Sequence, residues 1–164
     1  MFMTYVADMS LCSYHSGALD ANNWNCPLYA IGWLEGNNVF SQKKGEGGEL
    51  PVALRDRIAF LRFAFSEAFR SIVFRGLHEC SLCPSNSKGN HSAILYESHI
   101  NLFIPGEDCV FVAPGRIDHY MKQHNYKPPK IFTDAIMECP DPESNIYKKM
   151  LIKVNGGITP PLYK

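Results

Sequence analysis

The longest regular pattern of apolar and polar positions lies between residues 51 and 75 and predicts a helix. Its apolar side chains recur at spacings of three and four, at Leu54, Ile58, Leu61, Phe65, Phe69 and Ile72. That spacing places them on one face of a 3.6-residue period. Pro51 suits the first helical turn, and Gly76 supplies a stop. We therefore predict a central amphipathic helix against which the remaining elements pack.

Three further aromatic side chains, Phe60, Phe63 and Phe74, lie within the same stretch. We interpret them as widening the apolar face of the helix, because aromatic side chains bury large areas in protein cores. A row of aromatic side chains that binds a ligand is the alternative. Charged residues interrupt the stretch well short of the roughly 18 apolar residues that a membrane-spanning helix needs. We therefore expect no membrane span.

Shorter segments on either side of this helix have the composition of strands. TYVADM (4–9) and PLYAIGWL (27–34) contain β-branched and aromatic residues and are separated by turn formers, which predicts two strands or extended pieces. SAILYES (92–98) and CVFVAP (109–114) predict a β-hairpin further along the chain. The N-terminal third and the region after the central helix therefore supply the strands.

Three short helices complete the predicted pattern. They are expected at residues 116–124, at IFTDAIM (131–137) after two prolines, and at NIYKKMLIK (145–153). The fold class that follows is α+β, with all 164 residues in a single domain. Within it we predict a Cys/His unit at 76–126 and a C-terminal extension at 138–164.

Charge and composition narrow the classes of partner. The 16 basic and 16 acidic residues cancel, so no overall charge attracts nucleic acid or an anionic membrane. The N-terminal residues MFMTYVADMS lack the basic flank and apolar core of a signal peptide, from which we expect a cytoplasmic location. In that reducing compartment the six cysteines are expected to be thiols or metal ligands and not disulfides.

Two cysteines and two histidines form the pattern with the clearest chemistry. Cys80 and Cys83 stand at C-x2-C spacing in GLHECSLC, and His119 and His124 at H-x4-H spacing in IDHYMKQH. Thiolates and imidazoles at these spacings close the tetrahedral shell of structural zinc sites. On a helix the two histidines lie about 140° apart, so both reach one ion only if the last turn loosens. Asn125 suits the left-handed position that would end the helix there.

The ligand set has one alternative. His78 offers a further donor beside the cysteine pair, so a second possible set replaces one of the two helix histidines by His78. His91 and His99 are expected to be ordinary surface histidines. A cysteine turn, a hairpin and a helix with two further ligands follow one another as in a treble-clef zinc unit. Zinc is favoured over other metals because thiolate and imidazole ligands are mixed.

Three alternatives to a structural zinc site also remain. Cys80 and Cys83 could pack as a small buried pair without metal. Thiol redox chemistry is disfavoured, because Pro84 and a hairpin follow the pair where a redox-active C-x2-C motif has a helix. An open metal site with Glu79 as a base lacks the H-E-x-x-H context.

The order of several motifs resembles an uncharacterised family of small bacterial proteins of unknown function. The motifs are TYVADMSLCSY, IGWLEGNNVF, GLHECSLC, a Gly-Asn turn, VFVAPGRIDHYMKQHNYKPP and IFTDAI. The resemblance covers residues 4 to about 137, is looser around residues 21–26, and leaves the tail from Cys139 outside. It implies a single domain with a Cys/His cluster and brings no activity with it.

Three function classes follow from these observations. The first is a non-enzymatic, zinc-stabilised protein that binds another protein as an accessory factor. The second is a metal-dependent enzyme of the hydrolase type, with an open site at which His78, His119 or His124 lies near a water. The third is nucleic-acid binding through the treble-clef-like unit. Its basic residues would be Arg116, Lys122, Lys127 and Lys130, and the zero net charge weakens it.

Acidic side chains give no support to a catalytic site. Three of them are expected at exposed surface or turn positions: Glu107, Asp108 and Asp118. No pair of carboxylates is framed by a recognisable motif.

Overall fold

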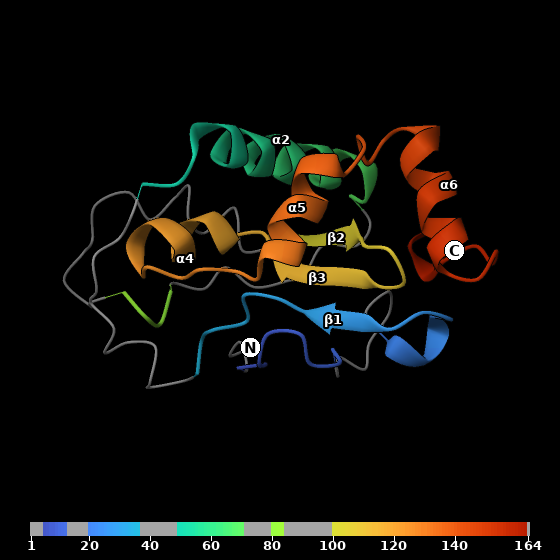
Figure 1. Ribbon diagram of the computed structural model, residues 1–164. Coiled ribbons are helices and arrows are strands. Elements are labelled where there is room, and N and C mark those ends of the chain that lie inside the picture. The colour runs from blue at the N-terminus through green and yellow to red at the C-terminus, as the bar shows by residue number, and fades with distance from the viewer. Residues whose placement is uncertain (1–4, 13–19, 37–48, 71–79, 84–99, 164) are drawn as a thin grey trace.

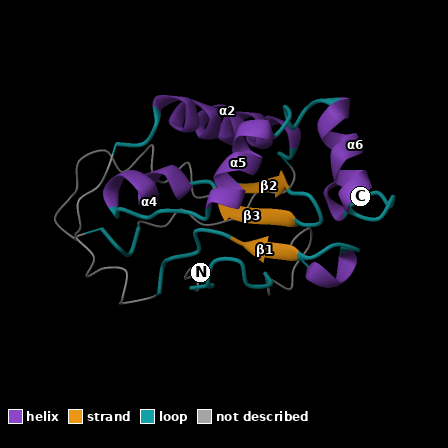
Figure 2. Ribbon diagram, viewed as in Figure 1, coloured by secondary structure: helices purple, strands orange, loops and turns teal. Residues whose placement is uncertain are grey.

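A three-stranded mixed sheet lies at the centre of the fold (Figures 1 and 2). The structure is a computed structural model that describes residues 5–12, 20–36, 49–70, 80–83 and 100–163. The strands are β1 (Leu28–Ala30), β2 (Asn101–Pro105) and β3 (Val110–Pro114), in the order β1-β3-β2. β1 pairs with β3 in parallel, and β2 pairs with β3 antiparallel. The fold is α+β, as predicted from the sequence.

The hairpin of the sheet differs from the predicted one. β3 was expected to pair with residues 92–98, which lie outside the described residues, but its antiparallel partner is β2 at 101–105. Because β1 occupies the other edge of β3, no edge remains for a third strand. The N–H group of Gly106 donates to the carbonyl of Cys109 across the connection (2.8 Å). This short turn makes β2 and β3 a local pair.

Helices α2 (Val52–Ala68) and α5 (Lys130–Glu138) lie together over one face of the sheet (Figure 1). The α2 side chains Ile58, Leu61 and Phe65 are buried in the core, as the periodicity predicts. Arg57 of α2 donates to the carbonyl oxygens of Ile136 (3.4 Å) and Cys139 at the end of α5. The central helix is thus confirmed over Val52–Ala68. It ends at the C-cap Phe69, earlier than predicted, and the expected stop at Gly76 lies outside the described residues.

The predicted role of the additional phenylalanines is wrong for the two that the structure describes. Phe60 and Phe63 are 40% and 65% exposed. At 100° per residue they fall on the side of α2 opposite Ile58, Leu61 and Phe65. Phe74 lies outside the described residues. The apolar face of α2 is therefore narrower than its composition suggests.

The N-terminal segment lies along the outer edge of β1 (Figure 1). Instead of a full strand it forms isolated antiparallel bridges, Val6 with Trp33 and Leu11 with Tyr29. A turn at residues 8–10 separates them, and Met9 within it has a φ of 64°. This left-handed backbone interrupts the extended run. Of the two predicted strands, only the one within 27–34 forms a strand of the sheet, as β1.

The C-terminal residues belong to the same core. Helix α6 (Asn145–Val154) forms where predicted, and the Ser144 side chain accepts a hydrogen bond from the Tyr147 N–H group at its start. Tyr147 and Leu151 are fully buried, and the Tyr147 hydroxyl donates to the carbonyl of Phe103 in β2 (2.7 Å). Short 3-10 turns at Ala21–Asn23 and Pro161–Tyr163 complete the described elements. None of the helices in the described ranges is long and apolar enough to cross a bilayer.

Candidate metal centre

A tight turn presents the two cysteines of the predicted site. The N–H group of Cys83 donates to the carbonyl of Cys80 (3.2 Å), which closes a turn over residues 80–83. Cys80 is buried and Cys83 is partly exposed. The C-x2-C spacing thus brings both thiols to the same side of one turn.

Helix α4 (Ile117–Gln123) presents the two histidines. His119 lies within the helix, whereas His124 is its C-cap with φ −119° and ψ 12°. Asn125 follows with a φ of 51°, the left-handed position expected from the sequence. This departure from helical geometry is the predicted loosening of the last turn, and it brings both imidazoles to the same point.

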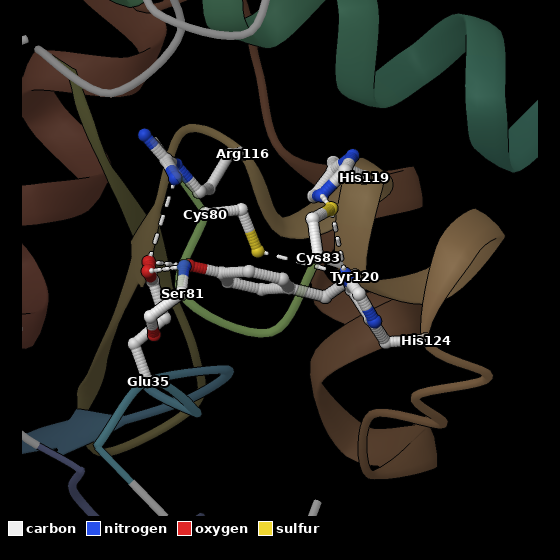
Figure 3. A network of polar contacts seen from close by, with 8 residues as sticks. All are labelled: Glu35, Cys80, Ser81, Cys83, Arg116, His119, Tyr120 and His124. Atoms are coloured by element: carbon white, nitrogen blue, oxygen red, sulfur yellow. Dashed lines mark hydrogen bonds and ion pairs between the residues drawn. The ribbon is translucent and has the colours of Figure 1, made fainter. Parts of the chain in front are cut away.

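The four side chains converge with the geometry of a metal site (Figure 3). The Sγ atom of Cys83 lies 3.3 Å from Nε2 of His119 and 3.4 Å from Nε2 of His124, and Sγ of Cys80 lies 3.5 Å from Nε2 of His124. One donor atom from each of the four residues lies within 4.8 Å of all the others. Zinc bonds of about 2.3 Å to sulfur and 2.0 to 2.1 Å to nitrogen, meeting at a tetrahedral angle, separate sulfur and nitrogen by about 3.6 Å. Three of the sulfur–nitrogen separations are therefore close to the edge of a tetrahedral zinc shell.

Burial favours the neutral forms of the two imidazoles and of the Cys80 thiol. Burial, together with the neighbouring His124 and Arg116, lowers the pKa of His119 to about 4, and burial lowers the pKa of His124. Both imidazoles are therefore unprotonated near neutral pH and can donate a lone pair to a metal. Burial and the nearby Glu35 raise the pKa of the Cys80 thiol to about 12. A metal must therefore displace the proton of this thiol when it binds.

A buried carboxylate, that of Glu35, contacts the backbone of the cysteine turn. Glu35 is 3% exposed and accepts hydrogen bonds from the Ser81 N–H group (2.7 Å) and the Tyr120 hydroxyl (2.5 Å), with the Arg116 guanidinium 3.5 Å away (Figure 3). Burial alone would raise the pKa of Glu35, but the bonds from Ser81 and Tyr120 and the charge of Arg116 lower it. Burial raises the pKa of Tyr120, so its hydroxyl keeps the proton that it donates.

Asp118 was expected at the surface, and that prediction is wrong. Its side chain is 7% exposed and forms an ion pair with Arg62 of α2 (2.8 Å). The same carboxylate accepts from the N–H group of His119 (2.9 Å) and lies 3.3 Å from Lys122. Asp118 is buried because it joins α4 to α2. Glu107 and Asp108 are exposed in the turn after β2, as predicted.

Arg116 also departs from its predicted place. It was counted among four surface cations, yet its side chain is fully buried beside Glu35. Lys122, Lys127 and Lys130 are exposed. The predicted basic patch therefore loses the member nearest the start of α4.

Four residues that the sequence brought into consideration lie outside the part of the chain that the structure describes. His78, the alternative ligand, and Glu79 fall in 71–79, and His91 and His99 fall in 84–99, both outside the described residues. All six cysteines are described, and none of them forms a disulfide, as expected. Within the described ranges, Cys80, Cys83, His119 and His124 are the group that could hold a metal ion.

The sequence analysis missed Glu35 and Tyr120. Glu35 directly follows the apolar run of PLYAIGWL, and all five residues of 31–35 are buried. A charged residue that continues a buried strand-like run is a signal for an internal partner, because buried charges are almost always paired. The identity of that partner is visible only in the fold.

Comparison with known sequences identifies the family of the chain. No match was found among curated proteins or among solved structures. The model of a domain of unknown function, DUF7919, matches residues 4–137, the range over which the motifs resemble an uncharacterised family. The match covers far more than half of the chain, and it includes all four residues of the Cys/His cluster. The chain therefore belongs to the family of the domain of unknown function DUF7919.

Proposed function

We propose that Cys80, Cys83, His119 and His124 bind one structural zinc ion, and that the protein is a non-enzymatic, zinc-stabilised binding factor. The sulfur to nitrogen distances of 3.3 to 3.5 Å carry the proposal, because they match the edges of a tetrahedral zinc shell. Two thiolates and two imidazoles favour zinc over magnesium or calcium, which prefer oxygen ligands. Two thiolates would also neutralise the charge of the ion.

The proposed ion has a structural task. It would join the 80–83 turn to α4, two segments separated by more than thirty residues of sequence. Binding energy at such a site contributes directly to folding energy. The order of elements, a cysteine turn followed by the β2–β3 hairpin and α4, supports the treble-clef interpretation.

A closed ligand set favours a structural over a catalytic role. A zinc ion held by four protein ligands has no open position for a water, whereas catalytic sites keep one. His119 is 8% exposed, which further limits access of a substrate from that side. The alternative of a metal-dependent hydrolase therefore requires one of the four residues to leave the ion.

A protein partner fits the surface better than nucleic acid does. The outer face of α2 exposes Phe60 and Phe63, which are neighbours at i, i+3 spacing, and aromatic side chains are enriched at protein interfaces. Nucleic-acid binding requires several cations that contact phosphates, and Arg116 is buried. A cytoplasmic location is part of the proposal, since six cysteines that form no disulfide suit a reducing compartment.

Metal analysis of the untagged full chain tests the site. We expect about one zinc per chain, lost in Cys80→Ser and retained in the control Cys26→Ser, which replaces a buried cysteine outside the cluster. Cobalt(II) bound in place of zinc would show the visible absorption of a tetrahedral thiolate site. A wild-type chain that contains no metal and takes up none when zinc is added would contradict the proposal.

A further inference from the structure

Glu35 contacts both of the segments that carry the metal ligands. It lies in the loop after β1 and is almost fully buried, although it belongs to neither segment. One oxygen of its carboxylate accepts from Ser81, between the two cysteines, and the other accepts from Tyr120, beside His119 (Figure 3). A single side chain thus connects the cysteine turn with the helix of the histidines.

The contact with Ser81 fixes the backbone of the turn. Ser81 is exposed overall, yet both its backbone N–H group and its side-chain hydroxyl contact the Glu35 carboxylate. A carboxylate that accepts from a backbone N–H group forms a charge-assisted hydrogen bond, which is stronger than a neutral one. The orientation of the peptide after Cys80 determines where the Cys80 and Cys83 thiols point.

Tyr120 and Arg116 fix the carboxylate in turn. Both come from α4 or its N-cap, and both side chains are fully buried. Glu35 is therefore held in place by α4 and in turn holds the cysteine turn against it. The hydrogen bonds of Glu35 to Ser81 and Tyr120 thus join the cysteine turn to α4 without using any of the four candidate ligand atoms.

We propose that Glu35 is a positioning residue that holds the Cys80–Cys83 turn in its metal-binding geometry through the Ser81 N–H group. The inference rests on the proposed zinc site and adds a specific determinant of its affinity. Groups that orient metal ligands from outside the first coordination shell typically change affinity 10- to 100-fold when they are replaced. The loop after β1 thereby contributes to a site whose proposed ligands all lie between residues 80 and 124.

The test is the zinc Kd of the full chain, measured by competition with a chelator under reducing conditions. Glu35→Asp keeps the charge but is one methylene shorter, so its carboxylate withdraws from Ser81. Glu35→Gln keeps the reach and an acceptor oxygen but loses the charge that faces Arg116. We expect Glu35→Asp to raise the Kd by about 10- to 100-fold, and Glu35→Gln to remain much closer to wild type. A general loss of stability would not by itself make the zinc Kd of Glu35→Asp higher than that of Glu35→Gln.

Asn155→Ala is the matched control. Asn155 is a fully buried polar residue that also accepts from a distant backbone N–H group, that of Asn25 (2.7 Å), but it touches none of the ligands. We expect this variant to be destabilised with an unchanged zinc Kd. A wild-type Kd in Glu35→Asp, or an equal rise in Asn155→Ala, would overturn the positioning role. A wild-type chain that binds no zinc would overturn the site itself, which distinguishes the two failures.

Discussion

Asp118 joins helix α4 to helix α2 and lies next to His119 of the candidate metal site. Its carboxylate pairs with Arg62 of α2 at 2.8 Å and also accepts from the backbone of His119. Because both charges are largely removed from water, loss of one partner leaves the other uncompensated. The position of His119, the first candidate histidine ligand, therefore depends on the ion pair between Asp118 and Arg62. Arg62 lies outside both the C-x2-C and the H-x4-H motif.

Asp118→Ala should lower the free energy of unfolding by roughly 2 to 4 kcal/mol, because it removes the buried carboxylate that forms an ion pair with Arg62. Urea denaturation of the full chain measures this. Asp134→Ala is the control, since Asp134 pairs with Lys130 on an exposed face of α5 with side chains 57% and 85% exposed. Exposed pairs of this kind contribute about 0 to 1 kcal/mol. Equal losses in the two variants would contradict a buried role for Asp118.

The four Cys/His residues of the site could be predicted from the sequence, whereas the side chains that surround them could not. The four candidate ligands follow from the C-x2-C and H-x4-H spacings, since each pair needs only its own turn or helix end to converge. Glu35 could not be found in this way, because its partners Ser81 and Tyr120 lie 46 and 85 positions away. Asp118 was misplaced for the same reason, since Arg62 reaches it only after α2 and α4 pack together.

At the scale of elements, α2 shows how burial divides a helix that is aromatic on more than one side. Phe65 is 1% exposed and contacts the rings of Phe69 and Tyr147, whereas Phe63, two residues earlier, is 65% exposed. Periodicity predicted the buried set correctly, because spacings of three and four define one face. The aromatic composition alone was misleading, because it does not show on which side of the helix a phenylalanine lies.

Two substitutions in α2 test this division. Phe65→Ala should cost about 3 to 5 kcal/mol of unfolding free energy, because it leaves a cavity among packed aromatic rings. Phe63→Ala should change stability by no more than about 0.5 kcal/mol, as for other surface substitutions. Thermal and urea unfolding of both variants measure the difference. A large loss in Phe63→Ala would show that the outer face of α2 is covered in the folded chain.

The turn at 80–83 and helix α4 form a second pair of elements, and the proposed ion would join them. Removing zinc with a chelator should increase amide hydrogen exchange most in the 80–83 turn and at the C-terminal end of α4, since these segments lose their common ligand. The amides of β2 and β3, which are hydrogen-bonded to each other and fully buried, should remain protected. Exchange mass spectrometry with and without chelator measures this, and a uniform response across all elements would contradict a local role for the metal.

At the scale of the whole molecule, one core joins the family region to the residues after it. The buried cluster includes Leu28 of β1, Phe65 of α2, Phe111 of β3 and Leu151 of α6. The expectation of one α+β domain came from length and pattern, and the structure agrees with it. The resemblance ended at residue 137, so it carried no information about how closely α6 packs against β2.

The chain should therefore need α6 to fold stably. A chain that ends at Met137 loses the fully buried Tyr147 and Leu151, and with them the hydrogen bond from Tyr147 to Phe103. It should show no cooperative unfolding transition by circular dichroism, because apolar surface of β2 and α2 is left open to water. In the full chain, Leu151→Ala should cost about 2 to 5 kcal/mol, whereas Ile146→Ala, at a position on the same helix that is 69% exposed, should cost little. A shortened chain with the stability of the full one would mean that the family region holds a complete core and that α6 merely rests on it.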